Sequence, residues 1–146
     1  MKSKKVDLTT DSPLTYVVVV NWNRASDTIE CLKTLASSDY SNYRLLVVDN
    51  GSTDGSPDAI RAVFPAVEVI ANEDNLGFAR ASNVGIEYAS QQGADYVLLL
   101  NNDTLVNKRL LTELVTVGES DPQIGMLVPK ISRSAPNSAT MWSRFL

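Results

Sequence analysis

Four apolar segments of this sequence are each followed at once by aspartate and asparagine residues. The polar stretches are Asn21–Arg24, Asp49–Asp54, Asn72–Gly77 and Asn101–Thr104. Lysine, which ordinary solvated loops also carry, is absent from all four. Carboxylate and amide oxygens can accept hydrogen bonds from a ring imide or a ribose diol, and they can hold Mg²⁺ or Mn²⁺ beside a diphosphate. The pattern therefore favours a ligand crevice over a set of ordinary loops.

Two aspartates in these stretches could do different chemistry, and each has a structural alternative. Asp49 follows the apolar run Leu45–Val48, so it could bind a nucleobase or ribose from the end of a buried strand. It could instead cap the amides of its own turn, and the two roles can coexist. Asp103, after Asn101 and Asn102, could ligate a metal that acts as a Lewis acid on a leaving diphosphate, or it could form an Asx turn before the next helix.

A third candidate element is the segment that precedes the third predicted helix. Asn75–Gly77 leads directly into this helix, and Arg80 follows one turn later. A helix N-terminus attracts anions, and the guanidinium could add a fixed charge for a phosphate, although a solvated helix face is the alternative. Gly51–Gly55 is not a phosphate loop, because it lacks the GxGxxG spacing and the chain contains no Gly-Lys-Ser or Gly-Lys-Thr.

The composition narrows the available chemistry further. The 146 residues carry a net charge of −4, which disfavours a nucleic-acid-binding domain. The absence of histidine excludes Ser-His-Asp and Cys-His catalysis and nearly all zinc sites. Cys31 is the one cysteine, so no intrachain disulfide can form. The apolar runs are too short to span a membrane, and no secretory signal is evident.

The elements that must position these residues alternate along the chain. Continuous apolar runs predict buried strands at Tyr16–Val20, Leu45–Val48, Val67–Ile70, Tyr96–Leu100 and Met126–Ile131. Helical spacing predicts helices that begin near Ser26 or Asp27, Ser56, Phe78 and Asn107. This alternation predicts an α/β domain over residues 14–131, with an open, mainly parallel sheet and helices on both faces. Residues 1–13 are predicted to be a flexible tail and residues 132–146 an irregular one.

Four sequence blocks, in this order, resemble the catalytic domain of glycosyltransferase family 2, particularly its rhamnosyltransferase-like members. They are Val17–Arg24 (VVVVNWNR), Val47–Ser56 (VVDNGSTDGS), Asn75–Gly85 (NLGFARASNVG) and Leu98–Asp103 (LLLNND). The resemblance extends roughly from Tyr16 to Ile131. It implies a Rossmann-like GT-A fold, a nucleotide-diphospho-sugar donor, Mg²⁺ or Mn²⁺, and an inverting transfer to a glycan or lipid-linked acceptor.

The resemblance also implies roles for individual residues. Asp49 matches the nucleobase-binding aspartate of the family, and Asp103 matches the last carboxylate of the DxD motif, which holds the metal and the diphosphate. The first position of that motif is Asn101 here, a change that removes one charge. The other matched positions, in the first nucleoside-contacting loop, the loop flanking the donor and the DxD-like block, are Asn21, Trp22, Asn23, Gly77, Arg80 and Asn102.

No residue of this chain matches the general base of the family, so none is nominated, and the acceptor half of the family is expected beyond residue 146. The chain is thus predicted to be the donor-binding part of a truncated GT-A domain, which turns over poorly alone. The family also suggests a cytoplasmic enzyme near the inner membrane face, with a role in polysaccharide synthesis. A different class of function stays open: a non-catalytic interaction or assembly module, self-associating through an exposed sheet edge.

Overall fold

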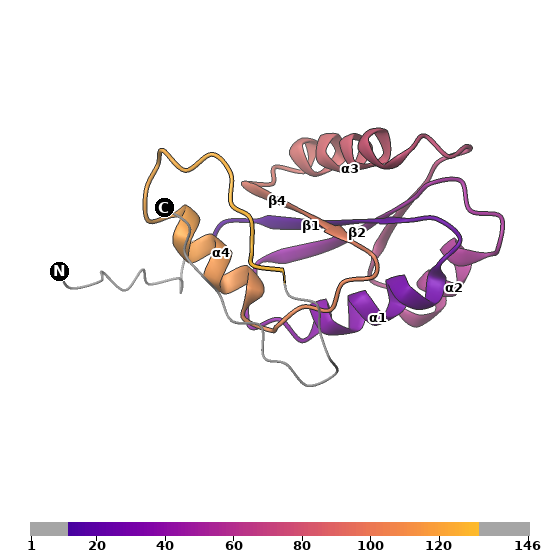
Figure 1. Cartoon of the computed structure of the whole chain (residues 1–146), viewed down its shortest axis with the longest axis horizontal. Coiled ribbons are helices and arrows are strands. Elements are labelled where there is room, and N and C mark those ends of the chain that lie inside the picture. The colour runs from indigo at the N-terminus through magenta and orange to yellow at the C-terminus, as the bar shows by residue number, and fades with distance from the viewer. Residues whose placement is uncertain (1–11, 132–146) are drawn as a thin grey trace.

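Four parallel strands form one sheet in the computed structural model, which describes residues 12–131 (Figure 1). Their order across the sheet is β3-β2-β1-β4, so the first strand of the chain is central and the last lies at an edge. This arrangement confirms the predicted open parallel sheet. The strands are β1 Thr15–Asn21, β2 Tyr43–Asp49, β3 Glu68–Ala71 and β4 Tyr96–Asn101.

The register of the sheet brings the polar strand ends to one level. Asn21 at the end of β1 lies opposite Asp49 at the end of β2. On the other side of β1, Val20 lies opposite Asn101 at the end of β4. Because parallel strands all finish at the same edge, the polar stretches that follow them open there together.

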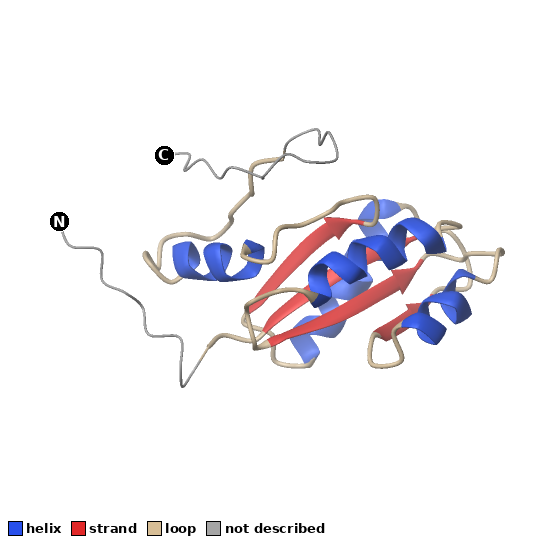
Figure 2. Cartoon of the chain, turned by 90° about the horizontal axis from the view of Figure 1, so that it is seen from below, coloured by secondary structure: helices blue, strands red, loops and turns tan. Residues whose placement is uncertain are grey.

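Helices cover both faces of the sheet, as expected. The helices α1 (Ala25–Ala36) and α2 (Ser56–Val63) lie on one face, and α3 (Phe78–Gln91) lies on the other (Figures 1 and 2). The last helix, α4 (Leu110–Gly118), lies towards the start of the strands (Figure 2). Each connection from one strand through a helix to the next parallel strand is short, as is usual for βαβ units.

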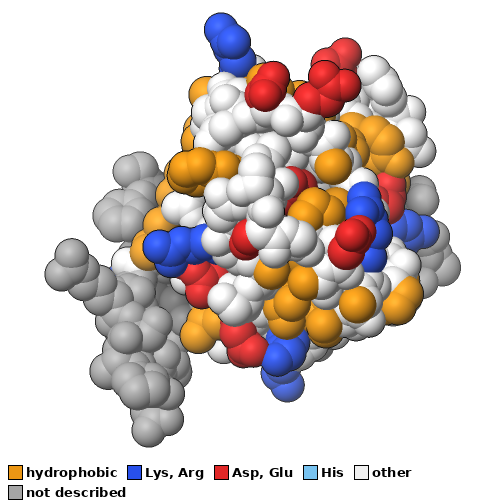
Figure 3. Space-filling model, turned by 90° about the vertical axis from the view of Figure 1, so that its right-hand side faces the viewer, with side chains coloured by type: hydrophobic (Ala, Val, Ile, Leu, Met, Phe, Trp, Pro, Cys, Tyr) orange, Lys and Arg blue, Asp and Glu red, His pale blue; other side chains and the backbone are white. Residues whose placement is uncertain are grey.

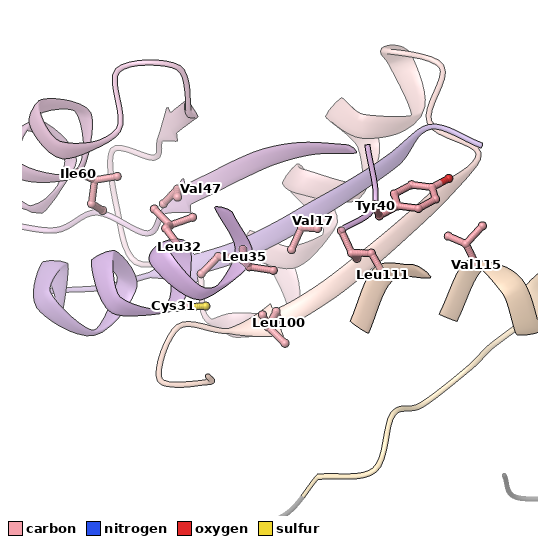
Figure 4. Close-up of a cluster of buried hydrophobic side chains, with 11 residues drawn as sticks. Val17, Cys31, Leu32, Leu35, Tyr40, Val47, Ile60, Leu100, Leu111 and Val115 are labelled. Carbon is pink, nitrogen blue, oxygen red and sulfur yellow. The ribbon is translucent and has the colours of Figure 1, made fainter. Parts of the chain in front are cut away.

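The alternation of side chains along β1 divides the core between the two faces. Val17 and Val19 pack with Leu32 of α1 and with Leu111 of α4 (Figure 4). Val18 faces the other way, towards α3. Successive side chains of a strand point to opposite faces, so a continuous apolar run is what a doubly covered strand requires.

A glycine lets α3 lie close to the sheet. A Cβ atom built on Gly85 would lie 2.3 Å from Cγ1 of Val18 and 3.1 Å from Cγ2 of Val48. The helix ends in a Schellman motif, in which the N–H of Ala94 donates to the carbonyl of Ala89 and Gly93 adopts φ +78°. This confirms the predicted role of Gly93 as the residue after the helix cap.

Three helix starts differ from prediction by one to three residues. The first helix begins at Ala25, ahead of the predicted caps at Ser26 or Asp27. The second begins at Ser56 itself, because Gly55 takes the capping position in a left-handed conformation. Asp54 then accepts hydrogen bonds from the backbone N–H and the hydroxyl of Ser56. The capping carboxylate therefore comes from outside the helix, where helical periodicity gives no signal.

The predicted cap of the last helix, Asn107, is wrong. The helix α4 begins at Leu110 with Arg109 as its N-cap, and Asn107 instead accepts a hydrogen bond from the N–H of Arg109.

The predicted fifth strand is wrong. Residues 126–131 form neither helix nor strand, and Met126 and Ile131 are 85% and 84% exposed. Pro129 lies within this run and has no N–H to offer a ladder. The predicted tails fall outside the described residues except for Ser12 and Pro13. Across residues 12–131, no helix is long and apolar enough to cross a membrane.

Candidate functional site

The strand ends open at one end of the molecule, where β1 and β2 finish at the right of Figure 1. Figure 3 faces this end and shows acidic, basic and apolar side chains interspersed over it. Asn21 and Asp49 lie beneath that surface, because both are buried. The amide Nδ2 of Asn21 donates to Oδ1 of Asp49 over 2.7 Å. The two strand ends are thus linked directly by their polar side chains.

Asp49 also closes its own turn. Its Oδ2 accepts a hydrogen bond of 2.9 Å from the backbone N–H of Ser52, and its Oδ1 accepts one of 2.7 Å from the Ser52 hydroxyl. The turn-capping role is therefore confirmed. Only 1% of Asp49 is exposed, so a carboxylate held in this way has lost most of its freedom to reorient. Its predicted contact with a nucleobase stays a prediction.

Asn23 joins the loops after β1 and β2. Its backbone N–H donates to the Ser52 hydroxyl over 2.8 Å, and its Oδ1 accepts a hydrogen bond from the N–H of Thr53. These contacts hold Asn23 at φ 51°, a left-handed conformation that asparagine tolerates better than most residues. The neighbouring Trp22 is 53% exposed, so its indole is available at the surface of the same loop.

A chain of hydrogen bonds continues from Asn21 across α1 to the end of β4. The Thr28 hydroxyl donates to Oδ1 of Asn21 over 2.7 Å. The amide Nδ2 of Asn102 in turn donates to that hydroxyl over 3.1 Å. Thr28 is fully buried, and Asn102 is half-buried. This series of hydrogen bonds therefore connects Asp49 to the Asn101–Asp103 turn. The sequence predicted the residues at its ends but not Thr28, because Thr28 lies inside a helix.

Asp103 lies at the exposed end of this turn. Its negative charge contributes to the raised pKa values of the Cys31 thiol and the Arg24 guanidinium. Burial is the main cause of the Cys31 shift, and the Asp27 carboxylate is the main cause for Arg24. The Cys31 thiol also contacts the carbonyl oxygen of Asn101 at 3.9 Å, a distance at which sulfur donates weakly.

Asn50 attaches the loop before α3 to the loop after β2, and sequence reasoning missed it. Its Oδ1 accepts from the N–H of Leu76 over 2.9 Å, and its Nδ2 donates to Oδ1 of Asn75 over 2.8 Å. The same Asn75 oxygen accepts from the N–H of Gly77. Asn50 is buried, and the signal that pointed to it was only its place in the polar stretch after β2.

Gly77 and Arg80 lie at the start of α3, as predicted. Gly77 is the N-cap residue, with φ +78° and ψ 161°, and Arg80 is exposed in the first turn. The backbone of the preceding loop lies hard against Gly51, where an added Cβ would be 2.6 Å from the carbonyl carbon of Asp74. The start of α3 is therefore held at the same edge as Asp49.

The donor set bears on the expected metal. Within residues 12–131, no group of three or more carboxylate or thiol side chains is arranged to hold a metal ion. Asp103 is the one carboxylate of the Asn101–Asp103 turn, and it is exposed. This set fits a cation that is shared with phosphate oxygens of a ligand, as Mg²⁺ often is, and it does not fit a cation held by protein alone.

Comparison with known proteins decides the family. The model of glycosyl transferase family 2 matches residues 16–144, which is most of the chain. The chain belongs to glycosyl transferase family 2. The match extends past Ile131, where sequence reasoning placed the end of the resemblance.

Individual relatives agree with this assignment. The chain is 31% identical over 117 residues to the glycosyltransferase GlyG of Streptococcus pneumoniae, covering 77% of this chain and 38% of GlyG. It is 29% identical over 123 residues to an N-acetylglucosaminyl-diphospho-decaprenol L-rhamnosyltransferase of Mycobacterium tuberculosis, covering 79% of this chain and 40% of that relative. The chain therefore spans well under half the length of these relatives.

A solved structure supports the fold assignment. A mannosyltransferase from Pyrobaculum calidifontis, solved in complex with GDP-Man and Mn²⁺, superimposes with a TM-score of 0.71 at 28% identity. The superposition covers 80% of this chain and 35% of the mannosyltransferase. The GT-A type of fold expected from the sequence is thus confirmed for the described part of the chain.

Proposed function

We propose that this chain forms the donor-binding part of an inverting glycosyltransferase. The enzyme transfers a sugar from a nucleotide-diphospho-sugar to a glycan or lipid-linked acceptor. The observation that carries the proposal is the continuous hydrogen-bonded link between Asp49 and the Asn101–Asp103 turn, at one edge of the sheet in a family 2 chain. Two polar groups held at a fixed separation are what recognition of a two-part ligand requires.

The buried end of this link is proposed to bind the nucleoside. Asp49 is oriented by Asn21 and by the Ser52 amide, and an unused lone pair on Oδ2 would accept a hydrogen bond from the base or ribose. Trp22 and Asn23 line the approach from the loop after β1, with the Trp22 indole offering a flat apolar face. The site is therefore rigid before the donor arrives, which lowers the entropic cost of binding.

The exposed end of the link is proposed to bind the diphosphate together with Mg²⁺ or Mn²⁺. Asp103 would be the ligand from the protein, and Asn101 and Asn102 would contribute amide groups. A divalent cation bound there would neutralise charge on the departing diphosphate. Gly77 and Arg80 would meet the phosphates from the other side, through the helix N-terminus and a guanidinium.

Two relatives support the donor and acceptor classes. The mannosyltransferase with a TM-score of 0.71 was solved with GDP-Man and Mn²⁺, and the mycobacterial relative is named as a rhamnosyltransferase acting on a lipid-diphosphate-linked sugar. By analogy, we infer a role in polysaccharide synthesis at the cytoplasmic side of a membrane. The general base is assigned to no residue of this chain.

Isothermal titration calorimetry with a panel of nucleoside diphosphates tests the proposal. GDP, UDP, dTDP and ADP are each titrated into the protein with and without Mn²⁺. We expect one of them to bind more tightly than the rest, and Mn²⁺ to strengthen its binding. Folded protein that binds no member of the panel, with or without Mn²⁺, would contradict a donor-binding role.

A second candidate is the non-catalytic assembly module. The observation that favours it is the outer edge of β4, which pairs with no other strand among residues 12–131. Leu99 on this strand is 41% exposed, and an open strand edge invites pairing with another chain. Light scattering separates the two candidates, because the module predicts a stable dimer without affinity for nucleotides.

A further inference from the structure

The hydrogen-bonded chain between β2 and β4 has a direction that chemistry determines. The Asp49 carboxylate can only accept, so Asn21 must present its NH₂ group to it. The Asn21 carbonyl oxygen then faces Thr28 and must receive the hydroxyl proton. That hydroxyl has a lone pair left over, which receives the NH₂ group of Asn102.

This direction settles the orientation of the Asn102 amide. An isolated asparagine at an exposed turn can exchange its oxygen and nitrogen by rotating about χ2, and the two orientations differ little in energy. Here the Thr28 hydroxyl already donates its hydrogen to Asn21, so it can only accept a hydrogen bond from Asn102. The Asn102 nitrogen is therefore fixed against Thr28, and its oxygen Oδ1 is left for other partners.

We propose that Thr28 is a positioning residue that presents Asn102 Oδ1, beside Asp103, as an oxygen acceptor for the metal–diphosphate group of the donor. The inference rests on the proposed donor-binding function and adds a residue that lies away from the ligand. An amide oxygen is a hard ligand that suits Mg²⁺ or Mn²⁺, and it would add a ligand atom to that of Asp103 without replacing the charge that is missing at Asn101. A flipped amide would instead place an NH₂ group there, which a cation repels.

The burial of Thr28 makes this arrangement sensitive to one hydroxyl group. Thr28 is the fourth residue of α1 and has no exposed surface. If its hydroxyl is removed, no water molecule can therefore take its place. Valine has nearly the shape of threonine and removes the hydroxyl alone. Serine keeps the hydroxyl and removes only a methyl group. The pair Thr28→Val and Thr28→Ser therefore separates hydrogen bonding from packing.

The test compares two ligands that share a base. The nucleoside diphosphate that wild-type protein binds most tightly is titrated with Mn²⁺ into wild type, Thr28→Val and Thr28→Ser, and the matching nucleoside is titrated without metal. For Thr28→Val we expect about ten-fold weaker binding of the diphosphate with Mn²⁺. Nucleoside binding should stay within about two-fold of wild type, and Thr28→Ser should match wild type for both ligands.

Each other outcome overturns the inference. Unchanged diphosphate affinity in Thr28→Val would refute the positioning role, and equal losses of nucleoside and diphosphate affinity would indicate a general structural role instead. Loss of affinity in Thr28→Ser as well would show that the hydroxyl is not responsible. If thermal unfolding shows that Thr28→Val is not folded, Thr28→Ala takes its place in the comparison with Thr28→Ser. Wild-type protein that binds no nucleotide refutes the donor-binding function itself, whereas wild-type binding with an unaffected Thr28→Val refutes the positioning role alone.

Discussion

The side chains at the strand ends differ in where they point, although their sequence context is similar. Asn21 is fully buried and bonded to Asp49, whereas Trp22, the next residue, is 53% exposed. Asp103 is exposed at the end of its turn. Residue types predicted that these positions are polar and close together. They could not predict which groups bond to each other, because that depends on the register of strands far apart in sequence.

Asp103 carries the first prediction at this scale. We expect Asp103→Ala to abolish the Mn²⁺ dependence of nucleoside diphosphate binding while the protein stays folded, because the exposed carboxylate supports no part of the core. Calorimetry with and without Mn²⁺ measures this dependence. Asp58→Ala, which removes an exposed carboxylate on α2, is the control and should behave as wild type. Unchanged Mn²⁺ dependence in Asp103→Ala would refute its role as a metal ligand.

Cys31 carries a second prediction, on reactivity. Burial in the core, together with the nearby Asp103 charge, raises the pKa of its thiol to about 12. The thiolate is the reactive form, so the native protein should react very slowly with a thiol reagent at pH 8. The same reagent in urea gives the rate for the unfolded chain. Native labelling at that unfolded rate would show that Cys31 is accessible.

At the scale of elements, the loops after the strands are joined to one another by side-chain hydrogen bonds. Asn23 and Ser52 join the loops after β1 and β2, and Asn50 joins the loop after β2 to the loop before α3. Gly51 lies where the last two loops cross. The four strands and their helices were predictable from apolar periodicity, but these loop contacts were not, because turn residues carry no periodic signal.

Gly51 and Gly55 form a matched pair for testing this contact. Both have left-handed φ angles, +73° and +78°, but only Gly51 has backbone atoms within 3 Å of an added Cβ. Gly55→Ala should lower the free energy of unfolding by about 1 kcal/mol, the cost of the left-handed conformation alone. Gly51→Ala should cost about 1–3 kcal/mol more because of overpacking. Urea unfolding measures both, and equal losses would show that the loops can move apart freely.

The predicted fifth strand shows the limit of periodicity at this scale. The run from Met126 to Ile131 is apolar enough for a strand, yet a strand forms only where a partner edge meets it. An apolar sequence does not say whether that edge is within reach. The predicted helix starts were wrong for a related reason. The groups that cap α2, Gly55 and Asp54, precede the helix, where apolar periodicity gives no signal.

At the scale of the whole molecule, a hydrogen-bonded tyrosine and a buried cysteine make the free energy of unfolding fall as the pH rises above about 9. The hydrogen bond to Glu119 is the main factor that raises the pKa of Tyr96 to about 12, and burial raises the pKa of Cys31 to about 12. Each group thus holds its proton more tightly in the folded protein than its ordinary pKa of 10.0 or 9.0 implies. The stabilisation that these two protonated groups provide is fully present below about pH 9, and it is lost as the pH rises towards 12.

Thermal unfolding at several pH values measures this effect. We expect a midpoint that falls between about pH 9 and pH 12, and a smaller fall in Tyr96→Phe, which has no phenol to ionise. Tyr43→Phe is a useful comparison, because burial alone raises the pKa of that phenol. A midpoint that stays constant to pH 11 would contradict the raised pKa values.

The strand order carries a consequence for how the site is assembled. The central strand β1 is flanked by the second strand and by the last, and the N–H of Leu14 donates to Asp95, 81 residues away. Pairing of β1 with β2 closes a short loop and brings Asn21 to Asp49. Pairing of β4 with β1 closes a longer loop, so it loses more conformational entropy. Within the described residues, both edge strands, β3 and β4, pair on one side only, and such strands are the first to detach. Brief fraying of β4 would therefore displace the Asn101–Asp103 turn, the proposed diphosphate site, while the hydrogen bond between Asn21 and Asp49 stays in place.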